Sequence, residues 1–181
     1  MPAQAQRKDG EAPADALLVR IATGDEQAFA ALVGRYQGRF FGVARRLLDD
    51  DAEAEDAVQT TFLRVFRSAG AYRDQWSGST WLYRILTNVC VDQWRKRRAT
   101  DVSDALDETP APARGTERID VDRALAKLPT EARAILVLCY VEDLSYAEIA
   151  RARGISVNTV KTQLARAKRS MRAHLNEGEK P

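Results

Sequence analysis

The sequence predicts an all-α protein made of two small helical domains joined by a flexible linker. Three observations support this fold class. None of the 6 prolines in the 181 residues lies between residues 14 and 109, so helices there can continue without interruption. Apolar residues, 45% of the chain, recur mostly at steps of three and four, as on the buried face of a helix. An acidic segment with two prolines, residues 99–118, separates the two patterned parts.

The first domain is expected over residues 15–98, after a polar tail, residues 1–14, that we predict to be disordered. A long helix starts near Asp25, whose carboxylate suits a helix N-terminus. Three glycines spaced by four lie within this helix, and each costs about 1 kcal/mol relative to alanine. We expect the close approach of a neighbouring helix to offset that cost. These glycines are Gly34, Gly38 and Gly42.

A second helix begins in the acidic stretch DDDAEAED, and the loop SAGAYRDQWSGS follows it. Helical spacing resumes at Thr80 and ends in a basic run from Arg95 to Arg98, which the helix dipole alone would also favour. The linker, residues 99–118, carries 5 acidic and 2 basic residues, whereas residues 119–174 carry 10 basic and 6 acidic residues. The formal net charge of the whole chain is only +2 because the negative charge of the linker offsets the positive charge of residues 119–174.

The composition disfavours several classes of function. The sequence has a single histidine, His174, which disfavours a catalytic triad and a multi-histidine metal site. It contains no glycine-rich phosphate-binding motif. Cys90 and Cys139 lie in apolar helical patterns and are interpreted as buried small hydrophobic residues. No apolar run reaches the roughly 20 residues of a membrane span, and no signal peptide is recognisable. We therefore expect a cytoplasmic protein that is not an enzyme and uses no metal or cofactor.

The second domain, residues 119–175, contains the most specific pattern of the chain, SYAEIARARGISVNTVKTQLARAKRSM. This pattern predicts a helix-turn-helix at the C-terminal end of the all-α fold. Ala150 is small where two helices cross, and Gly154 allows the positive φ that the turn needs. The apolar stripe of the second helix consists of Val160, Leu164, Ala167 and Met171.

The other side of this second helix is basic. Between Ser156 and Ala173 there are five basic residues and no acidic one. Alone, such a face is often only a solvated surface, but after a helix-turn-helix it predicts insertion into the DNA major groove. Basic side chains would neutralise phosphates, and residues near the N-terminal half would reach base edges. The predicted DNA contacts are Asn158, Thr159, Lys161, Thr162, Gln163, Arg166, Lys168 and Arg169.

Four segments, in this order, resemble the extracytoplasmic-function (ECF) group of bacterial RNA polymerase sigma factors in the sigma-70 family. They are GDEQAFAALVGRYQGRFFGVARRLL, EAEDAVQTTFLRVF, TWLYRILTNVCVDQWRKRR and LPTEARAILVLCYVEDLSYAEIARARGISVNTVKTQLARAKRSM. The resemblance covers about residues 15–175. It implies a transcription initiation factor that binds core RNA polymerase and directs it to promoters. The first domain, sigma region 2, would melt and read the minus-ten element, and the second, sigma region 4, would read the minus-thirty-five element.

The resemblance also implies roles for individual residues. The helix that would bind the clamp of core polymerase contains Asp56, Val58, Gln59 and Phe62. The minus-ten segment supplies stacking rings and hydrogen-bonding groups, the chemistry that a melted strand requires. Its predicted contacts are Tyr72, Arg73, Gln75, Trp76, Thr80, Arg84, Asn88, Arg95 and Lys96. For the rings of Tyr72, Trp76 and Trp81 a structural role at the edge of the core stays open, and for Trp81 it is favoured.

The sequence departs from the family pattern at three places, and each affects one of the implied contacts. The departures are Thr60 in place of an acid, Gly78 and Ser79 in place of an aromatic and a polar or basic residue, and Gln163 and Ala165 in place of an arginine and a bulky residue. They put in question the clamp contact, the conformation of the minus-ten loop and the upstream sequence that is read. Trp76 is a candidate substitute for the missing aromatic residue.

The family resemblance implies further partners. Promoter DNA would be bound both as a duplex and as a melted strand, and an anti-sigma factor would cover both domains. The acidic linker would follow the RNA path of the polymerase. We expect no membrane insertion and a monomer when the protein is free. A dimeric helix-turn-helix regulator that acts without core polymerase is the alternative, and it would bind a palindromic site as a free protein.

Overall fold

The computed structural model describes residues 12–101 and 116–178, and every regular element in these two ranges is a helix. The first part contains α1 (Ala14–Ala22), α2 (Glu26–Leu48), α3 (Asp51–Ser68), the 3-10 helix η1 (Ala69–Ala71) and α4 (Gly78–Asp101). The second part contains α5 (Thr116–Ala126), α6 (Thr130–Tyr140), α7 (Tyr146–Arg153) and α8 (Val157–Gly178). No described helix is long and apolar enough to cross a membrane.

The expected tail and linker fall mainly outside the described residues, at residues 1–11 and 102–115. Their ends are nevertheless defined. Helix α1 already begins at Ala14, which is buried, so this last residue of the expected tail belongs to the folded domain. The ends of the expected linker are helical as well, because α4 continues to Asp101 and α5 begins at Thr116.

Capping residues in the sequence fix the long helices of the first domain. The Asp25 carboxylate accepts a hydrogen bond from the Ala28 amide at 3.0 Å and so caps α2, as expected from its position. Helices α2, α3 and α4 enclose an aromatic core centred on Phe40. Its ring stacks on Phe62 at 5.3 Å between centroids and meets Tyr83 edge-on at 5.6 Å. Cys90 lies in this core, fully buried.

The second domain folds as the sequence predicts around its helix-turn-helix. Ser145 and Glu148 form a capping box at the start of α7. Gly154 ends α7 with φ +66°, the left-handed conformation expected of the turn. Val160, Leu164 and Ala167 are buried along α8, whereas Met171 is half-buried. Cys139, expected to be buried, is only half-buried.

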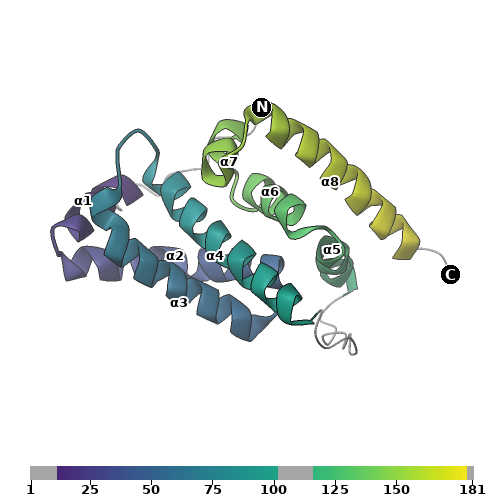
Figure 1. Cartoon of the computed structure of the whole chain (residues 1–181), viewed down its shortest axis with the longest axis horizontal. Coiled ribbons are helices and arrows are strands. Elements are labelled where there is room, and N and C mark those ends of the chain that lie inside the picture. Colours follow the sequence, from purple (N-terminus) through teal and green to yellow (C-terminus); the bar gives the residue numbers. More distant parts are fainter. Residues whose placement is uncertain (1–11, 102–115, 179–181) are drawn as a thin grey trace.

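The two domains also pack directly on each other. Helix α4 contacts α3 on one side and α6 and α7 on the other, so it lies in the middle of the molecule, while α8 forms the outer edge (Figure 1). Helix α2 in turn contacts α5 and α6. The arrangement therefore places one helix of the first domain, α4, beneath the helix-turn-helix of the second.

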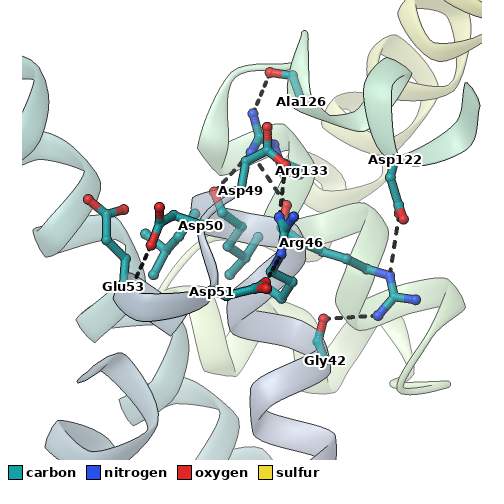
Figure 2. A network of polar contacts seen from close by, with 12 residues as sticks. Gly42, Arg46, Asp49, Asp50, Asp51, Glu53, Asp122, Ala126 and Arg133 are labelled. Atoms are coloured by element: carbon teal, nitrogen blue, oxygen red, sulfur yellow. Dashed lines mark hydrogen bonds and ion pairs between the residues drawn. The ribbon is translucent and has the colours of Figure 1, made fainter. Parts of the chain in front are cut away.

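Arg133 of α6 connects the domains through backbone carbonyl groups (Figure 2). Its buried guanidinium donates to the carbonyl oxygen of Leu47 at 2.9 Å, near the C-terminus of α2, and to that of Leu128 at 3.2 Å, after α5. Carbonyl groups at helix C-termini carry partial negative charge and have no partner within their own helix, so a cation suits them. Nearby, the Arg46 guanidinium of α2 pairs with the Asp122 carboxylate of α5 at 3.9 Å (Figure 2).

Candidate functional site

The basic side of α8 is open to solvent at the outer edge of the molecule. Ser156 caps the helix, because its hydroxyl accepts a hydrogen bond from the Thr159 amide at 3.0 Å. Five of the eight predicted DNA contacts are exposed to solvent on polar faces of α8: Asn158, Lys161, Thr162, Arg166 and Arg169. The surface thus has the accessibility and charge that a helix in the major groove needs.

The other three predicted contacts on α8 have neighbours within the protein. The Thr159 hydroxyl lies 2.8 Å from that of Ser156. The Lys168 ammonium lies 4.9 Å from the centre of the Tyr140 ring, and a hydrogen bond to the Tyr140 hydroxyl raises the pKa of Lys168. Gln163 is half-buried and lines a cavity of about 360 Å³ between α8 and α4. In this arrangement Gln163 faces the first domain.

The loop before α4 does not expose all of its predicted stacking rings. Tyr72 is buried, and its ring packs edge-on against Trp81 at 5.6 Å. The Tyr72 hydroxyl donates to the Asp15 carboxylate of α1, and burial together with this carboxylate raises the pKa of Tyr72. Of the two readings of Tyr72, its burial favours the structural one.

Trp76 and its neighbours form the accessible part of the loop. The Arg84 guanidinium lies 4.6 Å from the centre of the half-buried Trp76 ring, a cation–π contact. Gln75 and Arg73 are exposed, and Arg73 donates to the carbonyl oxygen of Gly70 at 2.9 Å, which holds the turn of the loop. The loop thus presents one ring with a cation beside it.

The polar residues along α4 meet the second domain. The Asn88 amide oxygen accepts a hydrogen bond from Arg153 of α7 at 3.3 Å. Arg95 pairs with the Glu131 carboxylate of α6 at 3.2 Å, and the same carboxylate pairs with Arg153. Buried Thr80 has its hydroxyl 2.7 Å from that of Ser77, which caps α4. Lys96 is exposed farther along α4.

A groove between α2 and α3 contains three of the four predicted clamp contacts. Val58, Gln59 and Phe62 line it, and its volume is about 790 Å³. Asp56 is not part of this groove, because its carboxylate lies on the side of α4 and accepts a hydrogen bond from Gln93. Glu55, and not Asp56, lines the groove together with Val58 and Phe62. Glu55 lies three residues before Val58 and seven before Phe62, so helical periodicity places it on the same face and could have predicted it.

The expected role of the glycine stripe is wrong. A methyl group added to Gly34 or Gly38 would meet nothing within 4 Å, and at Gly42 it would meet only the end of the Arg46 side chain at 3.4 Å. Among the described residues, no neighbouring helix approaches the stripe. Gly34 and Gly38 instead widen the groove that Val58 borders.

Comparisons with known proteins show the family of this chain. The sequence matches the family models for Sigma-70 region 2 over residues 32–100 and Sigma-70 region 4 over residues 118–171. It is 34% identical to ECF RNA polymerase sigma factor SigM of Mycobacterium tuberculosis, over 90% of this chain and 82% of SigM. It is 36% identical to ECF RNA polymerase sigma factor SigE of Mycolicibacterium smegmatis, over 85% of this chain but only 65% of SigE, less than two thirds of that protein.

A solved structure gives the same result for the fold. Sigma factor RpoE of Bartonella quintana, in a co-crystal structure with the anti-sigma factor NepR, matches with a TM-score of 0.69 and 25% identity. The match covers 82% of this chain and 96% of RpoE. The chain therefore belongs to the ECF sigma factors of the sigma-70 family. Members of this family are transcription initiation factors that direct RNA polymerase to promoters, and they are known as non-enzymatic proteins.

Proposed function

We propose that three surfaces of this chain have separate roles in promoter recognition. The groove between α2 and α3 binds core RNA polymerase, the loop before α4 with the polar side of α4 reads the melted minus-ten strand, and α8 reads the minus-thirty-five element. In this proposal region 2 is residues 15–98, region 4 is residues 119–175, and the acidic segment 99–118 joins them. The observation that carries the proposal is the placement of the basic α8 face and the α2–α3 groove on different domains.

The exposed side of α8 suits a duplex. Arg166 and Lys161 are accessible, and the Ser156 cap leaves the helix N-terminus free of acidic side chains that would repel phosphates. Each phosphate that a basic side chain neutralises contributes a slope of about −0.9 to the dependence of log affinity on log salt concentration. The affinity of the holoenzyme for duplex promoter DNA should therefore fall steeply as salt rises.

The loop before α4 suits an extruded base. The Trp76 ring offers a stacking surface, and Arg84 beside it supplies a cation for a phosphate or a base edge. Asn88 offers both a donor and an acceptor for a base edge, and Arg95 and Lys96 offer charge for the strand that follows. These groups lie along one helix and the loop before it, so they can follow one strand.

Region 4 contacts part of the proposed minus-ten surface in the arrangement seen here, although the Arg95 side chain is still 64% exposed. Asn88 and Arg95 contact Arg153 and Glu131 of region 4, and a DNA strand cannot occupy the space that α7 takes. We infer that α7 moves away from α4 during promoter opening, which frees Asn88 and Arg95 from these contacts. Binding of core polymerase in the groove of region 2 would supply the energy for this change, because it favours the separated arrangement.

We infer the remaining properties from the family. The protein acts in the cytoplasm as a monomer, has no enzymatic activity of its own, and binds neither a metal nor a cofactor. The structure of RpoE with the anti-sigma factor NepR supports control of this chain by an anti-sigma factor.

Run-off transcription with purified bacterial core polymerase tests the proposal. The template is a DNA library with randomised minus-ten and minus-thirty-five positions, and initiation at selected sequences is expected only when core enzyme and this protein are both present. Gly38→Leu fills the groove without a backbone conflict and should abolish core binding, whereas Leu63→Ala, exposed on α3, is the matched control. Tight binding of the free protein to palindromic duplexes, with no initiation, would instead support the dimeric regulator.

A further inference from the structure

The N-terminus of α1 contacts both ends of the loop that precedes α4. Asp15 lies before residue 32, where the match to region 2 begins. Its carboxylate oxygen Oδ1 accepts a hydrogen bond from the Gly78 amide at 2.7 Å, at the first residue of α4, and another from the Tyr72 hydroxyl. One carboxylate thus holds the residue that enters the loop and the residue that leaves it.

Gly78 makes this contact possible. A Cβ atom at position 78 would lie 2.7 Å from the amide nitrogen of Asp15 and 2.8 Å from the carbonyl carbon of Ala14. Both are backbone atoms, so the clash could not be relieved by a side-chain rotation. The close approach of α1 therefore requires glycine at position 78. This accounts for the departure at Gly78, where the family pattern has an aromatic residue.

Hydrogen bonds then extend from this contact to Trp76. The Tyr72 hydroxyl shares its single proton between the Asp15 carboxylate and the carbonyl oxygen of Trp76, which lies 2.7 Å away. The Ser77 hydroxyl accepts a hydrogen bond from the Thr80 amide at 3.3 Å. The backbone on both sides of Trp76 is thereby fixed relative to α4. Its ring can then remain beside Arg84, at the 4.6 Å already described.

We propose that Asp15 is a positioning residue for minus-ten recognition, which acts through Tyr72 and Gly78 to hold Trp76 beside Arg84 before DNA binds. The inference rests on the proposed function. Its physical basis is preorganisation: a loop that is already ordered loses less conformational entropy when it captures a base. Asp15 itself, in contact with the Tyr72 hydroxyl and the Gly78 amide, does not touch DNA.

The first experiment measures promoter opening by the holoenzyme. A fluorescent base analogue in the minus-ten region of a library-selected promoter reports opening, and core binding and closed-complex formation are measured separately. Asp15→Ala should slow opening about tenfold, as expected for the loss of hydrogen bonds to a charged group, and leave core binding unchanged. Asp15→Asn keeps an Oδ1 acceptor for the Gly78 amide and should restore opening to within about threefold.

A matched control separates positioning from general stability. Asp25 is also a carboxylate at a helix N-terminus in region 2, but its hydrogen bonds go to Ala28 and Arg20. Asp25→Ala should lower stability without slowing opening relative to closed-complex formation. Equal losses of core binding and opening in Asp15→Ala, or unchanged opening, would overturn the proposal.

The second experiment needs neither polymerase nor DNA. The chain has 3 tryptophans, so replacing Trp81 and Trp94 by phenylalanine leaves Trp76 as the sole indole. Asp15→Ala should raise the quenching of Trp76 fluorescence by acrylamide about twofold or more, and Asp15→Asn should not, because the loop is released only when the acceptor is lost. Unchanged quenching would refute the positioning role even if the holoenzyme is active. A wild-type holoenzyme that initiates nowhere, with quenching as expected, would instead contradict the proposed function.

Discussion

The two surfaces proposed to read DNA differ in their contacts with the rest of the protein. On α8, Lys161 and Arg166 are exposed to solvent at the edge of the molecule. On α4, Asn88 and Arg95 are already engaged by Arg153 and Glu131 of region 4. The Glu131 carboxylate, in particular, takes the place beside Arg95 that a phosphate would take. The exposed basic residues of α8 are therefore available in the free protein, whereas Asn88 and Arg95 must exchange their contacts with region 4 for contacts with the melted strand.

The largest expected effect comes from Arg133, which joins the domains. Arg133→Met keeps most of the side-chain volume but removes every donor to the carbonyl groups of Leu47 and Leu128. Of these two groups only the Leu47 carbonyl lies in the other domain, and leaving it unpaired costs about 1–3 kcal/mol, so packing of the domains should weaken and α4 should become more accessible. Hydrogen exchange of the α4 amides, followed by mass spectrometry, checks this. Protection of α4 equal to that of the wild type would mean that Arg133 does not hold the domains together.

Arg166 on the open surface should affect DNA binding alone. Arg166→Ala should weaken binding of the holoenzyme to duplex promoter by about 1–3 kcal/mol if the side chain contacts a base edge. Binding to core polymerase should not change, because α8 is far from the α2–α3 groove (Figure 1). The control is Arg172→Ala on the same helix, which should only reduce the salt dependence. A parallel loss of core binding in Arg166→Ala would show that the residue is structural.

Glu131 on the covered surface should affect the free protein. Glu131→Gln removes the carboxylate that pairs with Arg153, whose side chain is only 7% exposed, and with Arg95, an exposed pair that contributes about 0–1 kcal/mol. Binding of single-stranded minus-ten oligonucleotides by the free protein should therefore rise by roughly threefold to fivefold. Asp143→Asn is the control, because Asp143 is exposed in the same domain at φ 52°, which asparagine tolerates. An increase of the same size in both variants would reflect net charge alone.

The smallest expected effect is a dependence of domain packing on pH through Glu142 of region 4. Burial raises the pKa of this carboxyl above its ordinary value of 4.5, although Tyr83, Arg39 and Arg46 stabilise its ionised form and Asp143 opposes them. The packed arrangement therefore binds the proton more tightly than the separated one. Packing should strengthen as pH falls through the raised pKa, and Glu142→Gln should remove this change. Hydrogen exchange of α4 at pH 7 and pH 5 measures it, and weaker packing at pH 5 would contradict the direction.

Local signals made the fold and the duplex-reading surface predictable. Gly154 with its positive φ, the Ser145 cap and the apolar stripe through Val160 are each encoded within a few residues, and the structure has all three. The contacts of Asp15 with Gly78 and of Asn88 with Arg153 join residues more than 60 positions apart. Helical periodicity carries no information about such pairs, so the contacts of α4 with region 4 and the anchored loop appear only in the tertiary structure.

The most direct test is the distance between α4 and α7 in the free protein and in the holoenzyme. Spin labels at Asp92→Cys and Arg151→Cys, with Cys139→Ser and the buried Cys90 left in place, allow this distance to be measured by pulsed electron paramagnetic resonance. We expect one short distance in the free protein and a longer one when core polymerase is bound. The same short distance in a holoenzyme that opens promoters would contradict the conclusion that Asn88 and Arg95 leave their contacts with region 4 when the minus-ten strand binds.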